Sequence, residues 1–436
     1  MLCLIEFEFY SINHFRKRLS FRARALFLFL FFLKKENRNN LLGGGKLFLC
    51  TYYTGVFFTK VYKWRYFPKN MIEKQRKQVL YPPVVAAHIS RDLGDLVAPY
   101  IDDQREIEVY FSSQPNSRPH LGTLTTVSSA FALAYHLKAR FGLDSKVTFE
   151  ALDNAPAMKR EVNGFTYFKP MCFTKAGEET LAEKNLASFE HFMKAIQRRS
   201  NIPYSVKRYS EMQKSPEYRQ KLLEILDYEE ELSGFLNPLE RSIKLRPICP
   251  SCSYGEKSGK LTQTTRKDND LELRSNCFEH GDYAVDISAK GENFVDLNTP
   301  VRSVIRKALL MDESKKGSSL KIMVDGSDWI GMSQQLLPCL GTLGYSIRDL
   351  PIRFFSPLIE DWAGSKFSKS AYVKSGTYEG IHPALCDYEE FQSSLGEEGL
   401  DLIWDETLEW VLDSKKFFRN YTVDYFTQRW NLDSRD

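Results

Sequence analysis

The feature that most constrains the fold is a strand–helix–strand pattern in the segment 106–152. Residues 106–113 alternate and then run apolar, as a β-strand does, and residues 124–141 carry an apolar stripe at helical spacing that stops before Gly142. Residues 146–152 repeat the strand pattern. Two strands joined by a helix form a βαβ unit, in which the strands are parallel and the crossover is right-handed. The sequence therefore predicts an α/β fold.

The pattern returns late in the chain, with strands expected at 320–324 and 352–359 and a helix at 333–343. We therefore expect a doubly wound parallel sheet of the Rossmann-like type, interrupted by an insertion. The expected parts are an atypical N-terminal segment outside the fold (1–70), the first half of a nucleotide-binding domain (71–155), a helical insertion with a cysteine cluster at 249–280 (156–298), the second half (299–375) and a short helical C-terminal segment (376–436).

The first 70 residues differ from the rest, since no acidic residue occurs between Asn37 and Ile72. An apolar run at 25–33 follows a group of arginines but is far shorter than the ~20 residues that span a bilayer. Three explanations stay open: translation that begins at Met71, a targeting segment, or a membrane anchor. We expect the fold to begin at Met71 and no membrane partner, with a mitochondrial location as the alternative if the basic segment is genuine.

Composition narrows the class of protein. With 436 residues and 43% apolar residues the chain is long enough for two or three domains with buried cores, and a net charge of +4 excludes a global polycation, so any basic surface for nucleic acid is local. Most of the cysteines are scattered singly, which is not a disulfide framework and favours a reducing compartment such as the cytoplasm. These single cysteines are Cys3, Cys50, Cys172, Cys339 and Cys386.

A first short motif, Pro119-His120-Leu121-Gly122-Thr123, lies between the first expected strand and its helix. Ligands of open α/β sheets bind at the carboxyl ends of strands, and a helix N-terminus attracts phosphate. Gly122 permits close approach of the backbone to a triphosphate, and His120 or Thr123 supplies a donor. The alternative is a proline-initiated helix whose histidine has no function.

A second motif, Lys366-Phe367-Ser368-Lys369-Ser370, lies in a loop behind the expected strand at 352–359. Its two lysines present point charges that can follow a pyrophosphate group as it leaves. A charge pair on a loop is more often solvated surface. The order of the two motifs and their matching strand contexts favour a shared function.

Together the motifs resemble those of class I aminoacyl-tRNA synthetases, whose markers are His-Ile-Gly-His and Lys-Met-Ser-Lys-Ser. Thr123 stands at the last histidine and Phe367 at the methionine, so only His120 and Gly122 carry over from the first marker. The resemblance implies a nucleotidylyl-transferase type of fold, ATP with Mg²⁺ as substrate, and an amino acid and the acceptor end of tRNA as partners. The implied catalytic residues are His120, Lys366 and Lys369, and the implied ATP-binding residues are Gly122, Thr123, Asp328, Ser368 and Ser370.

Between the motifs, Cys249-x-x-Cys252 is followed by Cys277-x-x-His280. Three thiols and an imidazole in two paired knuckles match a closed, tetrahedral zinc site. A lone catalytic His280 and a thioredoxin-type redox pair are weaker interpretations, because neither has the expected surroundings. We expect structural Zn²⁺ that stiffens a small lobe.

Two further stretches narrow the resemblance. Asp328, in Asp325-Gly-Ser-Asp-Trp329, resembles the Gly-x-Asp-His segment that contacts adenosine in class I synthetases, and the alternative is an ordinary Asp-Gly turn. Asp153 opens a stretch similar to the acidic loop of class I lysyl-tRNA synthetases, where it would hold a cationic substrate. It is equally consistent with a helix cap.

The expected function is therefore activation of an amino acid by ATP and its transfer to tRNA, most closely like a lysine-tRNA ligase. The chain after Ser370 is short for an anticodon-binding domain of well over ~100 residues. A tRNA-independent adenylate-forming ligase of the same fold and an inactive RNA-binding paralogue therefore stay open, as do the amino acid and the oligomeric state.

Overall fold

The structure is a computed structural model. It describes residues 85–101, 106–267, 270–288, 293–317, 319–346, 349–368, 378 and 380–432. The predictions for the first 70 residues, and those for Lys369 and Ser370, lie outside these described residues.

A parallel five-stranded sheet forms the centre of the fold, in the order β15-β14-β1-β2-β7. In chain order this is the third, second, first, fourth and fifth strand read from the β7 edge, which is the Rossmann arrangement. The predicted α/β class with a parallel sheet is thus confirmed. The strands are β1 Glu106–Ser113, β2 Ser145–Ala151, β7 Tyr204–Arg208, β14 Ser319–Gly326 and β15 Ile352–Ser356.

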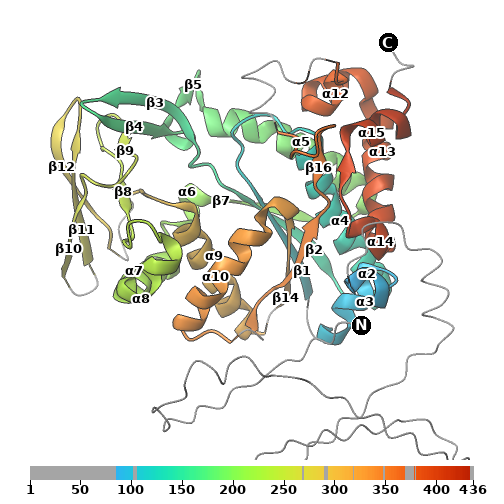
Figure 1. The fold of residues 1–436 in the computed structure, drawn as a ribbon, viewed down its shortest axis with the longest axis horizontal. Helices are drawn as coiled ribbons and strands as arrows, with labels where there is room; N and C mark the ends of the chain where they lie inside the picture. Colours follow the sequence, from blue (N-terminus) through green and yellow to red (C-terminus); the bar gives the residue numbers. More distant parts are fainter. Residues whose placement is uncertain are drawn as a thin grey trace, which may run out of the picture. The chain divides into compact units, whose positions relative to one another are not determined.

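Helices cover both faces of this sheet, as a doubly wound fold requires (Figure 1). Side chains of a strand alternate between faces, and Val109 and Phe111 of β1 join the core that contains α4 (Leu121–Phe141). Tyr110 points to the other face, where it packs against Leu310 of α9 (Thr299–Lys315).

α4 has clear boundaries that the sequence anticipates. Its last turn ends at Gly142, which takes the left-handed conformation with φ of 70°. Glycine adopts this conformation without the steric cost that a side chain would incur, and it frees the chain to turn into β2.

The segment between the two halves of the sheet differs from the expected insertion. β7 lies within it yet pairs with β2 as the edge strand, and α5 (Leu181–Ser200) stacks Phe189 on Phe149 of β2. Most side chains of β7 are only half-buried, because it is an edge strand. This explains why its mixed polar sequence shows no strand pattern.

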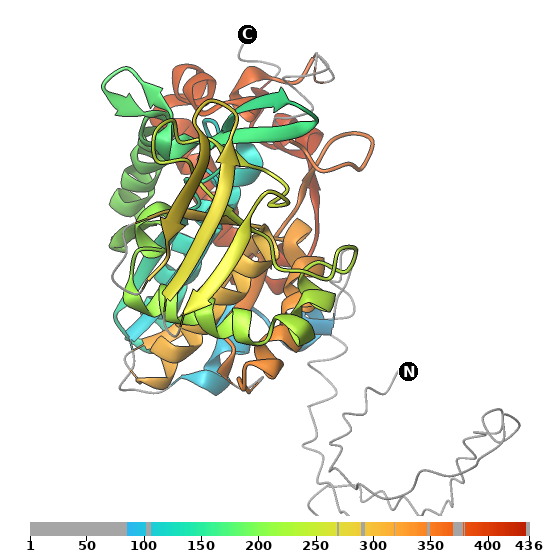
Figure 2. The ribbon, with the colours of Figure 1, turned by 90° about the vertical axis from the view of Figure 1, so that its left-hand side faces the viewer.

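What remains of the segment forms a lobe of short antiparallel strands and helices, seen at the left of Figure 1 and facing the viewer in Figure 2. The lobe shares a hydrophobic core with α9 and with α10 (Ile330–Thr342). Its sheets are β3 Pro156–Val162, β4 Phe165–Pro170 and β9 Gly255–Glu256; β10 Gln263–Lys267, β11 Asp270–Cys277 and β12 Gly281–Asp286; and β8 Leu245–Pro247 with β13 Val295–Leu297. Its helices are α6 Tyr209–Met212, α7 Pro216–Asp227 and α8 Glu229–Leu236. Strands β5 Lys175–Ala176 and β6 Glu179–Thr180 form a small pair before α5.

The C-terminal part is helical, as expected, and packs on α4. Ser128 of α4 and Thr407 share a hydrogen bond of 2.7 Å, and the rings of Tyr135 and Trp404 meet edge to face. Strand β17 (Tyr421–Thr422) runs parallel to β16 (Ile359–Glu360). The helices are α12 Pro383–Cys386, α13 Tyr388–Leu412, α14 Ser414–Phe417 and α15 Val423–Arg429, and the short helices α2 Val85–Ile89 and α3 Leu93–Val97 precede β1. Among the described residues, no helix has the length and apolar character needed to cross a bilayer.

Candidate active site

Two adjoining cavities open at the carboxyl edge of the sheet, between β1 and β14. The smaller, of about 120 Å³, lies among the start of α4, the end of β14 and the segment 357–367. The larger, of about 300 Å³, extends from there to α9 and α10. Both are lined by His120, Thr123 and Lys366. Strand order reverses at this point, which is where open α/β sheets bind their ligands.

His120 caps the N-terminus of α4 at the boundary of the two cavities. Its Nδ1 accepts a hydrogen bond of 3.2 Å from the backbone N–H of Gly122, so the neutral ring carries its proton on Nε2. The ring is further held by an edge-to-face contact with Phe367, with centroids 5.7 Å apart. The imidazole is thereby fixed beside the positive end of the helix dipole.

A side chain at Gly122 would crowd this ring. A Cβ built on Gly122 would lie 3.2 Å from Cε1 of His120 and 3.7 Å from a side-chain carbon of Ile359. Thr123 follows in the first turn of α4, with its N–H bonded to the carbonyl of His120 at 2.8 Å. The absence of a side chain at Gly122 therefore leaves room for the imidazole and exposes the first turn of the helix to the cavity.

The second motif meets the first through Phe367. Its side chain is buried, its N–H donates to the carbonyl of Ile359 at 2.9 Å, and its ring also contacts Tyr378 at 4.9 Å. The N–H of Ser368 donates to the hydroxyl of Tyr378 at 3.3 Å. The aromatic residue that stands at the marker's methionine thus links the two motifs by packing.

Lys366 and Asp328 form an ion pair at the rim of the smaller cavity, with Nζ and Oδ2 2.5 Å apart. The lysine side chain is 46% exposed and the aspartate side chain 27% exposed. A pair this exposed to water contributes little stability, so either partner is available at low cost to a ligand. Asp328 lies just after β14 and Lys366 belongs to the second motif, so the fold brings two distant segments together.

Asp153 does not line either of these cavities, although it follows β2 directly. Its buried carboxylate accepts from the N–H of Ser210 at 2.9 Å and from the hydroxyl of Ser210 at 2.5 Å. Burial raises the pKa of this carboxyl. Its neighbour Leu152 lines the larger cavity instead, and the contacts of Asp153 resemble the helix-cap alternative, because they hold the start of α6.

The larger cavity is also lined by charged residues outside the two motifs, which sequence patterns did not indicate. Arg306 forms an ion pair with Glu150 and donates to the hydroxyl of Ser112 at 2.5 Å. Arg353 pairs with Asp325 at 2.5 Å. A further cation, Lys307, lines the same cavity, and burial together with repulsion from Arg353 lowers its pKa to about 7.

One sequence signal marks these residues. Arg306 and Lys307 stand between Ile305 and Ala308, which are both fully buried, so the charged pair lies on a helix that is covered on most sides. Lysine and arginine side chains are seldom fully buried unless they are paired with an opposite charge. The partners of Arg306 are Ser112 of β1 and Glu150 of β2, which sequence patterns do not connect to α9.

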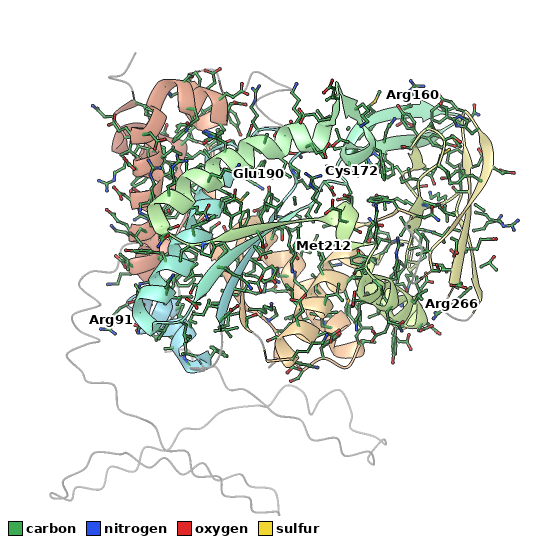
Figure 3. All side chains as sticks on the ribbon, turned by 180° about the vertical axis from the view of Figure 1, so that it is seen from behind. Arg91, Arg160, Cys172, Glu190, Met212 and Arg266 are labelled. Carbon is green, nitrogen blue, oxygen red and sulfur yellow. The ribbon has the colours of Figure 1, made fainter. Side chains whose placement is uncertain are left out.

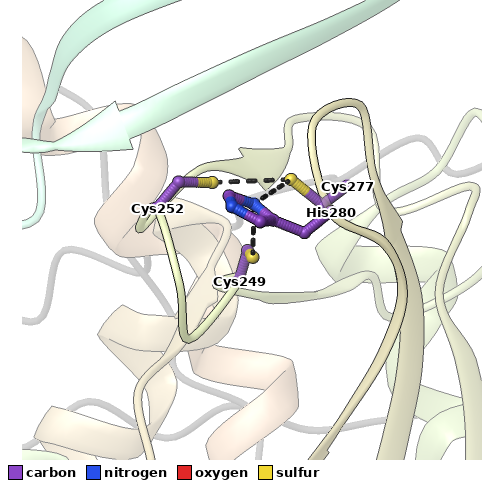
Figure 4. Close-up of side chains that lie close together, drawn as sticks. All are labelled: Cys249, Cys252, Cys277 and His280. Carbon is purple, nitrogen blue, oxygen red and sulfur yellow. Dashed lines mark hydrogen bonds between the residues drawn. The ribbon is translucent and has the colours of Figure 1, made fainter.

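The cysteine cluster is assembled in the lobe (Figure 4). The ligand atoms of Cys249, Cys252, Cys277 and His280 all lie within 4.8 Å of one another. Sγ of Cys252 is 3.4 Å from Sγ of Cys277, and Nδ1 of His280 is 3.7 Å from Sγ of Cys249. A tetrahedron with metal–sulfur bonds of about 2.3 Å has edges of roughly 3.8 Å. The donor set and its spacing therefore fit zinc.

No protein-family model and no curated protein matches the sequence. Among solved structures, the chain aligns with a glutamate-tRNA synthetase from Elizabethkingia anophelis at 13% identity, covering 74% of this chain and 70% of that chain, with a TM-score of 0.34. It aligns with Mycobacterium tuberculosis methionyl-tRNA synthetase in complex with methionyl-adenylate at 14% identity, covering 76% and 69%, with a TM-score of 0.39. At such values the functional assignment rests on the chain's own residues.

Proposed function

We propose that this protein activates the carboxyl group of an amino acid with ATP and transfers the acyl group to tRNA, as a class I type of aminoacyl-tRNA ligase. The observation that carries the proposal is the contact between the two motifs. His120 at the N-terminus of α4 and Phe367, next to Lys366, meet at the switch point of a Rossmann-order sheet, with ring centroids 5.7 Å apart.

ATP is proposed to bind in the smaller cavity. The first turn of α4, which lacks a side chain at Gly122, offers the positive end of the helix dipole to the phosphates, and Thr123 offers a hydroxyl. Lys366 exchanges its partner Asp328 for phosphate oxygens, which frees the aspartate for the ribose hydroxyls. Ser368, Lys369 and Ser370 are proposed to assist from the same loop, and Mg²⁺ is expected to accompany the triphosphate.

The chemistry is proposed to occur in two displacements. A carboxylate oxygen of the amino acid bonds to the α-phosphorus of ATP while the bond to the bridging oxygen breaks, which releases pyrophosphate. A hydroxyl of the 3′-terminal ribose of tRNA then attacks the carbonyl carbon, which releases AMP and a proton. His120, Lys366 and Lys369 act by positioning the phosphates and offsetting their developing charge.

The lobe supports tRNA as the acceptor. The exposed strand β3 presents Lys159 and Arg160 at the lobe's outer end, where Figure 3 labels Arg160. The guanidinium of Arg160 lies 5.5 Å from the ring centre of Tyr254 and 5.7 Å from that of Phe278. Cations combined with aromatic rings suit phosphates and unstacked bases of RNA. Zinc held by the adjoining cysteine cluster would fix this surface.

Lysine is the amino acid that the sequence resemblance favours. The residue assigned to hold its ammonium group is Asp153, whose carboxylate is bonded to Ser210 inside the protein. The support for lysine is therefore the resemblance alone.

The proposal is tested by amino-acid-dependent exchange of pyrophosphate into ATP, followed by charging of tRNA. We expect exchange with one amino acid or one chemical class, and a loss of at least tenfold in His120→Ala and in Lys366→Ala. Lys194→Ala, which changes an exposed lysine on α5, is the matched control and should retain the wild-type rate.

Exchange that survives both site variants would overturn the assigned roles. Exchange without any charging of tRNA would select a tRNA-independent adenylate-forming ligase. Binding of tRNA without exchange for any of the twenty amino acids would select an inactive RNA-binding paralogue.

A further inference from the structure

We call the part of the larger cavity that is lined by Arg306, Lys307 and Arg353 its cationic end. Arg306 and Lys307 reach it from α9, and Arg353 reaches it from β15. Arg306 and Lys307 are both more than nine-tenths buried. Apolar and hydroxyl side chains of α10 line the same cavity, namely Met332, Ser333 and Leu336.

The charges at this end do not balance. Glu150 compensates Arg306, and Asp325 compensates Arg353. Lys307 has no hydrogen bond or ion pair with any residue in the described part of the chain. One basic group, buried and lining a cavity, is therefore left without an ion-pair partner of its own.

Donors at the same end are also unsatisfied. The Nε atoms of Arg306 and of Arg353 are buried without a hydrogen-bond partner in the described structure. A buried donor that lacks a partner costs about 1–3 kcal/mol. These two Nε atoms have almost no accessible surface, so a ligand in the cavity does not reach them and they add only to the cost of burying this region. The basic group that an anion in the cavity can meet is the amine of Lys307.

The position of the cationic end relates it to the proposed reaction. The larger cavity is lined both by His120 and Lys366, where the phosphates are proposed to bind, and by Lys307 of α9. An amino acid whose carboxylate reacts beside the phosphates would therefore share this cavity with Lys307.

We propose that this end of the cavity holds the side chain of the amino acid to be activated and that Lys307 selects a carboxylate there, so that the substrate is an acidic amino acid, aspartate or glutamate. The inference rests on the proposed function and names its substrate class. A single uncompensated cation matches a carboxylate with one negative charge better than a doubly charged phosphate. A lysine side chain would place a second cation against Lys307, where the interaction is repulsive.

Direct binding separates this inference from the proposed function. Calorimetry on the full chain, with and without a non-hydrolysable ATP analogue, compares aspartate and glutamate with asparagine, glutamine and lysine. We expect one acid to bind at least tenfold more tightly than its amide, and lysine to bind more weakly still. Lys307→Met should lose at least tenfold in affinity for the acid while its affinity for the ATP analogue stays within twofold.

Charge reversal provides a second readout. Lys307→Glu should exclude the acids and admit lysine. Lys315→Met changes another lysine of α9, one that pairs with Asp349 at 3.3 Å and does not line the cavity, and should bind the acid as the wild type does. Lys307→Met removes a buried charge, so its melting temperature should not fall, which excludes misfolding as the cause of lost binding.

The outcomes are distinct. Tighter binding of lysine or of an amide than of both acids would overturn the inference. It would also be overturned if inorganic phosphate displaced the ATP analogue from the wild type and Lys307→Met no longer bound phosphate, because Lys307 would then belong to the phosphate site. Exchange supported only by neutral or basic amino acids would overturn it while the proposed function stands. Binding of the acid without exchange for any amino acid would uphold it while the proposed function fails.

Discussion

At the scale of single residues, the site depends on a few side chains held in one state by their neighbours. His120 is fixed by the N–H of Gly122 and by the ring of Phe367, so its orientation does not depend on a ligand. Lys366 and Asp328 are paired at the cavity rim and exchange partners easily. Lys307 differs from both, because its side chain is buried and forms no ion pair with a residue in the described part of the chain.

This burial predicts how stability changes with pH. Burial, with repulsion from Arg353 and Arg306 only partly offset by Asp325, lowers the pKa of Lys307 to about 7, against ~10.4 in an unfolded chain. Between these values the unfolded chain binds more protons than the folded protein, so this group makes the free energy of unfolding rise with pH. Below pH 7 the destabilisation caused by burying the protonated amine is complete. The cost is on the order of 4 kcal/mol at low pH.

Lys307→Met should therefore be more stable than the wild type at pH 6, and the difference should shrink markedly by pH 9. Urea denaturation at both values measures it, with Lys315→Met as the control that shows no such trend. The charged groups that face Lys307 from α9, β14 and β15 are Arg306, Asp325 and Arg353. An equal difference at pH 6 and pH 9 would contradict the burial of a charged lysine.

At the scale of elements, the two cavities lie at the edge of the sheet and the cysteine cluster lies in the lobe. α4 supplies the helix N-terminus, β14 and β15 supply the charged ends, and α9 with α10 encloses the larger cavity. The cysteine cluster lies outside both cavities and connects the turn between β11 and β12 to the loop at 249–254. Metal is therefore expected to act on the lobe's rigidity and not on the chemical step.

The prediction is one zinc ion per chain, measured by mass spectrometry of the purified protein. Chelation, or Cys277→Ser, should loosen the lobe and weaken tRNA binding at least tenfold, because structural zinc contributes directly to folding energy. Pyrophosphate exchange, which needs only the cavities, should fall much less. Cys339→Ala, a buried cysteine of α10 outside the cluster, should retain the metal, and full zinc content in Cys277→Ser would contradict the assigned ligands.

At the scale of the whole molecule, the C-terminal helices belong to the main core. Trp410 of α13 is fully buried, its ring stacks on Tyr421 at 4.7 Å, and its Nε1 donates to Glu406 at 2.8 Å. α13 also packs along α4, the helix that carries His120. The aromatic residues of this part are thus structural.

Trp410→Ala should destabilise the fold by about 3–5 kcal/mol, through lost burial and the cavity that remains. Chemical denaturation measures the change. Leu412→Ala alters a half-exposed side chain two positions later and should stay within about 0.5 kcal/mol of the wild type. Similar effects in the two variants would mean that α13 does not contribute to the core.

Sequence patterns predicted the elements that are buried on regular faces. β1, α4, β2 and β14 follow the apolar periods closely, because burial on one or both faces dictates their residues. β7 was not predicted, because the side chains of this edge strand are only half-buried and show no apolar pattern. The ion pair of Arg306 with Glu150 and the burial of Lys307 could not be predicted, because they depend on contacts between distant segments. The hydrogen bonds between Asp153 and Ser210 likewise join separate parts of the chain.

The short pairing of β16 with β17 connects the second motif to the C-terminal part of the chain. β16 leads directly into the loop that carries Lys366, and its register is set by Tyr421, with Asn420 bonded to Glu360 at 2.6 Å. A version trimmed at residue 375 would keep every residue of both motifs and still lose the strand against which the second motif is aligned. The C-terminal part of the chain thus helps to align the loop of the lysine that is proposed to touch the nucleotide.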